Sequence, residues 1–147
     1  MLSDAELVER FGAVAVDRDN ADYYRGWLDH ELRVTRCADC GRWQHPPRPM
    51  CPACWSWNMV STPVSGRGTV HLLIRLHQGP PMDGVDYAAT PYPVAVVEVE
   101  EQPALRITST VVHCDPADVA IGMPVQLTWI DRGGVAFPAF EPVPADG

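Results

Sequence analysis

Four of the five cysteines in this 147-residue chain lie in two C-x-x-C pairs within one stretch, CADCGRWQHPPRPMCPACW. Each pair places two thiols on one tight turn. The short connection lets both turns approach a single ion tetrahedrally, with Zn–S distances of about 2.3 Å. Zinc is the metal that this pattern favours, and iron, disulfides or redox chemistry of the thiols are the alternatives. The predicted ligands are Cys37, Cys40, Cys51 and Cys54.

A site closed by four thiolates has no open position for water or substrate, so it is expected to be structural. His45 lies between the pairs and is a further candidate ligand, but we interpret it as an exposed loop histidine beside Pro46. Cys114 stands apart from the pairs, and a buried, inert thiol is the expected state of such a residue. The strongest motif in the chain therefore predicts stability and shape.

The remaining reactive side chains do not form a familiar catalytic pattern. The motifs GxSxG, GxGxxG and HExxH and the P-loop are absent from the sequence. His71 and Arg75 share the polar side of one expected strand, and Glu100 and Glu101 are interpreted as solvated charge. The residues alone favour a binding or scaffolding subunit over a self-sufficient enzyme.

Charge and composition further limit the class of protein to which this chain can belong. The formal net charge is -8, and all eleven basic residues are arginine, which argues against binding to nucleic acid. No apolar run reaches eighteen residues, and the start MLSDAELVER lacks the layout of a signal peptide. A cytoplasmic protein without a membrane span is expected, and reducing conditions there favour metal over disulfides.

The elements that position the cysteines fall into three predicted parts, residues 1–35, 36–62 and 63–147. The first is helical, with Ser3 or Asp4 capping one helix and Asp19 or Asn20 capping a second, ADYYRGWLDHEL. The aromatic rings of the second helix are expected to pack inward, a partner-facing surface being the alternative. The middle part is a proline-rich ribbon with little core of its own, so it needs a metal staple.

Residues 63–147 are predicted to form five strands. The first spans 68–78 with Val70, Leu72, Ile74 and Leu76 on one face. A long loop, 79–92, follows it, and the segment DPADVAIGM forms a helical turn between the third and fourth strands, capped by Asp115. The chain is thus predicted to be mainly β: N-terminal helices, a rubredoxin-like four-cysteine zinc ribbon and a five-stranded OB-fold barrel, with a sandwich as the weaker choice.

This order of parts resembles one known family. The core C-x-x-C-G … PPR-x-x-C-P-x-C, the strand entry SGRGTV, the turn IGM-V and the closing FPAFEPV carry the resemblance, which covers about residues 20–143. It is similar to the zinc-ribbon, OB-fold proteins once known only as a domain of unknown function and associated with acyl-CoA metabolism. In some of them the module is fused behind a hydratase-like domain, so this chain is either a stand-alone module or an excised one.

The resemblance implies a non-catalytic accessory subunit of a thiolase-like enzyme, such as a thiolase or a steroid side-chain aldolase. The partner then supplies the catalytic residues in a two-plus-two heterotetramer, and the small subunit bridges the complex and helps to hold the CoA thioester, in lipid metabolism or steroid degradation. An OB-fold nucleic-acid-binding module is the alternative function, and an independent enzyme using Cys114 or His71 is a third. The candidate contacts to CoA or the partner are Arg42, Trp43, Arg48 and Arg67. Trp43, Trp55 and Trp57 are expected to pack the ribbon onto the helices, with a partner-facing patch as the alternative.

Overall fold

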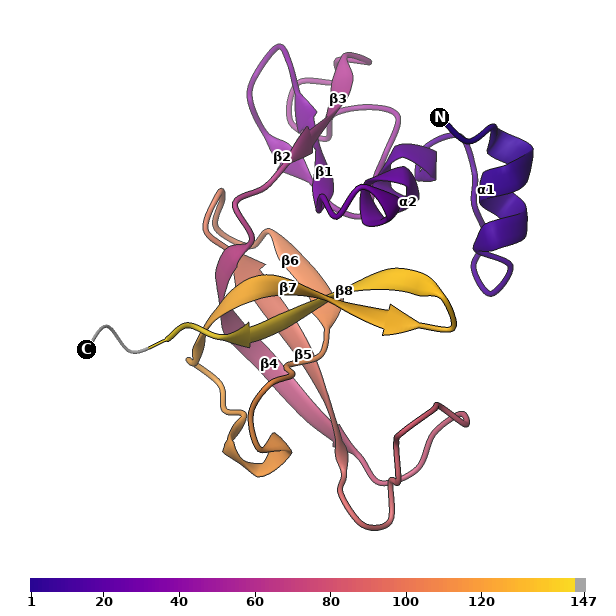
Figure 1. The fold of residues 1–147 in the computed structure, drawn as a ribbon. Coiled ribbons are helices and arrows are strands. Elements are labelled where there is room, and N and C mark those ends of the chain that lie inside the picture. The colour runs from indigo at the N-terminus through magenta and orange to yellow at the C-terminus, as the bar shows by residue number, and fades with distance from the viewer. Residues whose placement is uncertain (145–147) are drawn as a thin grey trace. The chain divides into compact units, whose positions relative to one another are not determined.

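The computed structural model describes residues 1–144, which are mainly β with two short α-helices (Figure 1). The chain divides into two compact units. The first contains Met1–Val64 and Gly133–Ala136, and the second contains Ser65–Arg132 and the residues from Phe137 onward. Within residues 1–144, neither helix has the length and apolar character required to cross a lipid bilayer.

Two helices begin the first unit. Helix α1 (Asp4–Arg10) starts at Ser3, whose hydroxyl accepts a hydrogen bond from the Glu6 N–H while the Glu6 carboxylate accepts one from the Ser3 N–H, so the predicted cap is a capping box. Helix α2 (Ala21–Leu28) ends at Leu28, four residues before the end of the predicted segment. It ends there because the chain turns at His30, which has a left-handed backbone with φ of 55°.

The aromatic residues of α2 pack against α1, as expected from the sequence. Leu7, Phe11 and Ala21 form the buried centre of this contact. The ring of Trp27 meets that of Phe11 edge-on at 5.7 Å, and the ring of Tyr24 lies 5.2 Å from that of Phe11. Such edge-on and tilted contacts are favourable for aromatic quadrupoles. The helices are therefore held by a small aromatic core of their own.

The cysteine segment is built on a three-stranded antiparallel sheet in the order β2-β1-β3. Its strands are β1 (Arg33–Cys37), β2 (Trp43–Gln44) and β3 (Met59–Pro63). We did not predict these strands, because proline-rich flanks and short lengths hide the alternation. Strand β1 leads directly into the first metal-binding turn, so the sheet fixes where Cys37 lies.

The second unit contains a five-stranded antiparallel sheet in the order β6-β5-β4-β7-β8, apart from the first two residues of β8, which are grouped with the first unit. An isolated parallel bridge between Val111 and Phe140 joins its two edges, which gives the predicted barrel. Alternate residues of β5 are buried, and they form the barrel core with Ile107, Val125 and Phe140. The elements are β4 (Arg67–Leu76), β5 (Tyr92–Val99), β6 (Arg106–Ser109), the 3-10 turn η1 (Pro116–Asp118), β7 (Pro124–Arg132) and β8 (Val135–Pro142).

The predicted single apolar face of the first long strand is wrong. Val70 is 1% exposed, but Leu72 and Ile74 are 49% and 51% exposed. The pairing of β4 with β5 shifts register between Val70 and Leu72, which marks a β-bulge. A bulge inserts one extra residue, here His71, and sends the following side chains to the opposite face.

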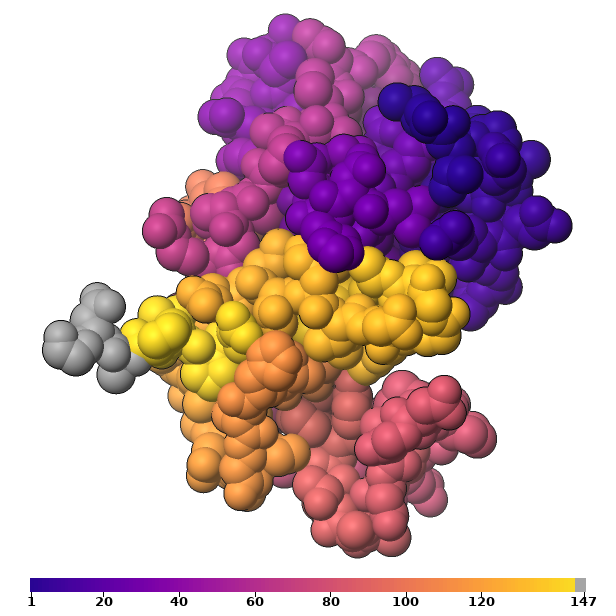
Figure 2. Space-filling view, in the orientation of Figure 1, coloured from indigo at the N-terminus to yellow at the C-terminus, as the bar shows by residue number. Residues whose placement is uncertain are grey.

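The turn between β6 and β7 is close to its prediction. The Asp115 carboxylate accepts a hydrogen bond from the Ala117 N–H, and Pro116 is the first residue of η1. The guanidinium of Arg75 donates to the carbonyl oxygens of Pro116 at 2.5 Å and Val119 at 2.7 Å, so β4 holds this turn in place. The loop 79–92 projects away from its strands in Figure 1 and forms a separate lobe in Figure 2.

Candidate metal centre and ribbon surface

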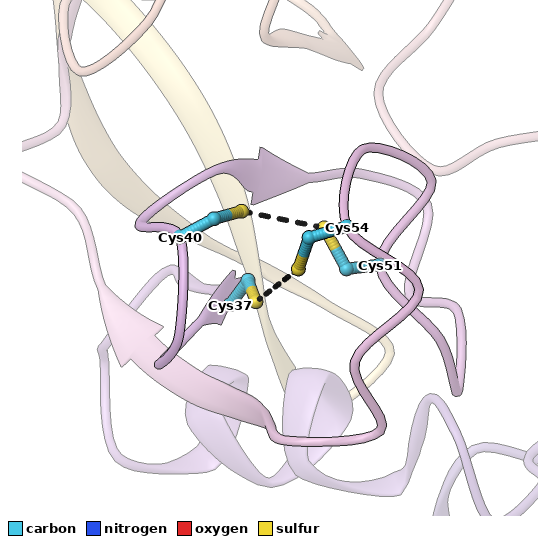
Figure 3. A group of neighbouring side chains, drawn as sticks. All are labelled: Cys37, Cys40, Cys51 and Cys54. Carbon is cyan, nitrogen blue, oxygen red and sulfur yellow. Dashed lines mark hydrogen bonds between the residues drawn. The ribbon is translucent and has the colours of Figure 1, made fainter.

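The four predicted ligands converge at the tip of the ribbon sheet (Figure 3). The Sγ atoms of Cys37 and Cys54 are 3.6 Å apart, as are those of Cys40 and Cys51, and all four sulfurs lie within 4.8 Å of one another. Four sulfurs bound tetrahedrally at about 2.3 Å from one ion would be about 3.8 Å apart. The cysteines are therefore positioned to bind a metal ion, and the donor set and spacing both fit zinc.

The two knuckles repeat one backbone turn. The N–H of Gly41 donates to the carbonyl oxygen of Cys37 at 2.8 Å, and the N–H of Trp55 donates to that of Cys51 at 2.9 Å. The residue after each pair has a left-handed backbone, with φ of 80° at Gly41 and 64° at Trp55. Glycine tolerates this region, whereas tryptophan occupies it only when its surroundings enforce it.

Backbone N–H groups in the same turns point at the sulfurs. The N–H of Cys54 donates to the sulfur of Cys51 and lowers its pKa to about 6, and the N–H of Cys40 lowers the pKa of Cys37 in the same way. At Cys54 the N–H of Ser56 also favours the thiolate, but desolvation and the neighbouring sulfurs raise the pKa to about 12. The positive charge of a divalent cation would offset this repulsion between thiolates. Thiols that bind such a cation are deprotonated outright.

His45 is not the exposed loop residue that we expected. Its ring is half-buried and lies 5.1 Å from the ring of Tyr23, and burial lowers its pKa to about 4. The group of side chains that could hold a metal contains the four cysteines and does not include His45. Its role is therefore packing between the ribbon and α2.

The four proposed contacts to CoA or a partner are distributed between the two units. Arg42 and Arg48 are exposed on the ribbon, while Arg67 belongs to the second unit, where it forms an ion pair with Glu100 at 3.1 Å. Trp43 is only 9% exposed and lies beneath the Arg36 guanidinium at 5.2 Å. Its ring is therefore mostly covered within the chain.

The exposed aromatic rings of the ribbon are Trp55 and Trp57, each 74% exposed. The preferred prediction, that they pack the ribbon onto the helices, is wrong for both. Trp55 is carried outward by the left-handed turn after Cys54, and Trp57 follows before β3 begins. Nothing in the residue types distinguished these rings from the covered Trp43.

Two family models match the chain. Residues 25–60 match "ChsH2, rubredoxin-like zinc ribbon domain", and residues 61–130 match "ChsH2, C-terminal OB-fold domain". The chain belongs to the ChsH2 family. The predicted family and fold are thereby confirmed: a zinc ribbon followed by an OB fold, in a family whose archaeal relatives are named DUF35 domain-containing scaffold proteins.

Curated relatives give the family context. The chain is 35% identical over 87% of its length to a probable enoyl-CoA hydratase alpha subunit from Thermomonospora curvata. It is 39% identical over 85% of its length to the 3-oxo-4,17-pregnadiene-20-carboxyl-CoA hydratase alpha subunit of Mycobacterium tuberculosis. It covers only 39% and 38% of those two proteins, so it corresponds to about two fifths of each.

Solved structures agree with the fold. A chain from the structure described as "Ltp2-ChsH2(DUF35) aldolase" superposes with a TM-score of 0.77 at 35% identity, covering 88% of this chain and 98% of that one. A DUF35 protein of unknown function from Sulfolobus solfataricus superposes with a TM-score of 0.58 at 15% identity, covering 95% of each chain. The second likeness supports the fold alone.

Proposed function

We propose that the chain is a non-catalytic accessory subunit of a thiolase-like enzyme that acts on acyl-CoA thioesters. The observation that carries this proposal is the match to nearly the full length of a ChsH2 chain described as part of an Ltp2-ChsH2 aldolase. A second relative is named as the alpha subunit of a steroid acyl-CoA hydratase. Both names describe one member of a larger assembly, which favours a partner-dependent role for this chain, in the cytoplasm and in lipid or steroid degradation.

The metal in this proposal is one structural zinc ion per chain. The sulfur spacing of 3.6 Å, the repeated N–H donors and the family description as a zinc ribbon all support it. Zinc bound there would supply a cross-link that holds the proline-rich turns. Because all four ligands come from protein, the ion would have no position for substrate.

The other reactive groups support a role without independent catalysis. Burial, together with Asp118 and Asp115, raises the pKa of Cys114, which leaves its thiol protonated and weakly nucleophilic at neutral pH. The ring of His113 is hydrogen bonded to the Glu141 carboxylate at 2.5 Å, and Gln126 holds the other carboxylate oxygen at 3.0 Å. This network ties the chain after β6 to β8 and is explained by barrel closure.

Binding of the CoA thioester is the finer part of the proposal. Exposed arginine guanidinium groups on the ribbon, at Arg42 and Arg48, match the phosphates of such a ligand. Trp55 and Trp57 are also exposed on the ribbon, and exposed aromatic side chains are typical of hot spots for a partner chain.

The experiment is co-expression of this chain with a thiolase-like chain of the source organism, followed by purification through a tag on this chain. We expect a stable complex whose mass corresponds to two copies of each chain. The Cys51→Ser variant should lose the complex, because the ribbon would lose its metal. Failure of the wild-type chain to retain any thiolase-like protein would overturn the proposal.

A further inference from the structure

A cavity of about 330 Å³ lies entirely within the first unit, beside the ribbon sheet and the start of α2. Its polar lining includes three guanidinium groups and two carboxylates, from Arg18, Arg33, Arg48, Asp19 and Asp22, and the exposed indole of Trp57 lies beside them. Its volume lies at the lower end of the range for small-molecule sites, about 300–1,000 Å³.

Two of the arginines are available to a ligand. Arg33 is already held by Asp29 at 2.8 Å and Glu31 at 2.7 Å. Arg18 and Arg48 are exposed, and within residues 1–144 neither forms an ion pair. Two free guanidinium groups at one cavity favour a ligand with a phosphate, which arginine binds through parallel hydrogen bonds.

The cavity also offers a flat apolar surface. The indole of Trp57 lines it and is 74% exposed, which leaves much of the ring available for stacking. Aromatic rings at protein surfaces stack favourably on nucleobases. Trp55 is equally exposed but does not line the cavity, so exposure alone does not define the site.

The carboxylates narrow the ligand class. Asp19 and Asp22 line the cavity, and Asp22 already pairs with Arg25 at 3.4 Å. A simple anion would be repelled by Asp19 while leaving the indole unused. An apolar chain would leave Arg18 and Arg48 without partners. A ligand that carries a phosphate, hydroxyl donors and a flat ring would satisfy all three kinds of side chain.

We propose that this cavity binds a phosphorylated purine nucleoside, with a phosphate on Arg18 and Arg48, the base on Trp57 and a free ribose hydroxyl toward Asp19. Such a group is found at the nucleotide end of coenzyme A and in free adenine nucleotides. The coenzyme A source rests on the proposed function, whereas the nucleotide chemistry rests on the cavity alone.

The test is titration calorimetry on the zinc-loaded full chain with adenosine 3′,5′-bisphosphate, coenzyme A, ATP, pantetheine and pyrophosphate as separate probes. We expect adenosine 3′,5′-bisphosphate to bind, and pantetheine and pyrophosphate to bind much more weakly or not at all. Binding of coenzyme A as tightly as the bisphosphate assigns the site to the coenzyme, and tighter binding of ATP than of coenzyme A assigns it to a free nucleotide.

Matched variants separate the cavity from the rest of the ribbon. Trp57→Leu and Arg48→Gln should each weaken binding of the bisphosphate about tenfold or more. Trp55→Leu, equally exposed, and Arg10→Gln, an exposed arginine of α1 that does not line the cavity, should leave it unchanged. Circular dichroism and zinc content confirm folding of each variant.

The proposal is overturned if no nucleotide binds, if pyrophosphate binds as tightly as the bisphosphate, or if the control variants lose as much affinity. Complex formation with the thiolase-like chain is measured separately on the same wild-type protein. An intact complex without nucleotide binding would overturn the proposed nucleotide site and leave the accessory role unaffected. Nucleotide binding without complex formation would overturn the accessory role alone.

Discussion

The sulfur of Cys37 lies 3.6 Å from the sulfur of Cys54, although seventeen positions separate these residues in the chain. The second contact between the pairs, from Cys40 to Cys51, has the same length. These contacts join two knuckles that are connected by a proline-rich segment with little core. The metal that they are positioned to bind is therefore expected to hold the ribbon together.

Metal content gives the first prediction. Freshly purified, reduced protein should contain about one zinc per chain, and removing it with a chelator should unfold the ribbon, because structural zinc binding contributes about 10–16 kcal/mol in small zinc domains. Elemental analysis and circular dichroism measure both effects. Cys51→Ser should lose the metal, while Cys114→Ser, which alters the cysteine outside the cluster, should retain it. A chain that keeps its fold and melting temperature after complete removal of metal would refute this role.

Acid should weaken the fold through His45. Burial lowers its pKa in the folded protein from 6.5 to about 4, so the folded state favours the neutral ring. Above pH 6.5 the ring is neutral in both states, and the full stability is present. As the pH falls from 6.5 toward 4, the unfolded chain takes up a proton that the folded chain does not, at a cost of about 3 kcal/mol.

The His45→Phe variant isolates this effect, because it keeps a ring beside Tyr23 and removes the titration. Urea unfolding of both zinc-loaded proteins at pH 7.5 and pH 5.5 gives the comparison, in which any shared loss of zinc cancels. The variant should lose less stability than wild type over this range. Equal losses in the two proteins would show that His45 does not titrate differently in the two states.

The turn η1 depends on one side chain from β4. Arg75 donates hydrogen bonds to the carbonyl oxygens of Pro116 and Val119. Arg75→Met should lower the free energy of unfolding by about 2 kcal/mol, because partly buried acceptors lose charge-assisted partners. The control is Arg106→Met, which removes an exposed pair with Glu98 and should cost about 1 kcal/mol or less. Similar losses for the two variants would argue against this role of Arg75.

Gly66 explains the entry sequence SGRGTV. Its φ is 83°, and an added Cβ would lie 2.5 Å from the Cβ of Leu127. Gly66→Ala combines backbone strain with a clash, so its cost should exceed the roughly 1–2 kcal/mol of the left-handed strain alone. Gly122→Ala measures that strain by itself, since its φ is 90° and nothing lies within 4 Å of an added Cβ. Thermal unfolding should show a larger drop in melting temperature for Gly66→Ala than for Gly122→Ala. Equal drops in the two variants would exclude the clash with Leu127.

Local chemistry explains what could be predicted from the sequence. The metal ligands follow from the spacing of the cysteines, and the cap at Ser3 and the turn at Pro116 follow from short-range hydrogen bonds. The predictions that failed depend on contacts between residues that are far apart in the sequence. The bulge at His71 moves the side chains of Leu72 and Ile74 to the opposite face of the sheet, and the residue types in this strand do not predict a bulge.

The tryptophans of the ribbon also show which features the sequence could not predict. Trp43, Trp55 and Trp57 have the same residue type within one ribbon, yet one is covered and two are exposed. The left-handed turn at Trp55 causes part of this difference, and it occupies a position where the first knuckle has glycine. Arg18 was not a predicted contact, because its approach to Arg48 depends on how the helices pack against the ribbon sheet.

The most direct test of the central claim is the turnover of a CoA thioester by the thiolase-like chain as this protein is added. An accessory subunit predicts little or no turnover by either chain alone. It also predicts a rise that saturates near one copy of this protein per catalytic chain. Full turnover by the thiolase-like chain alone, unchanged by the addition, would contradict the account, and so would turnover by this protein without a partner.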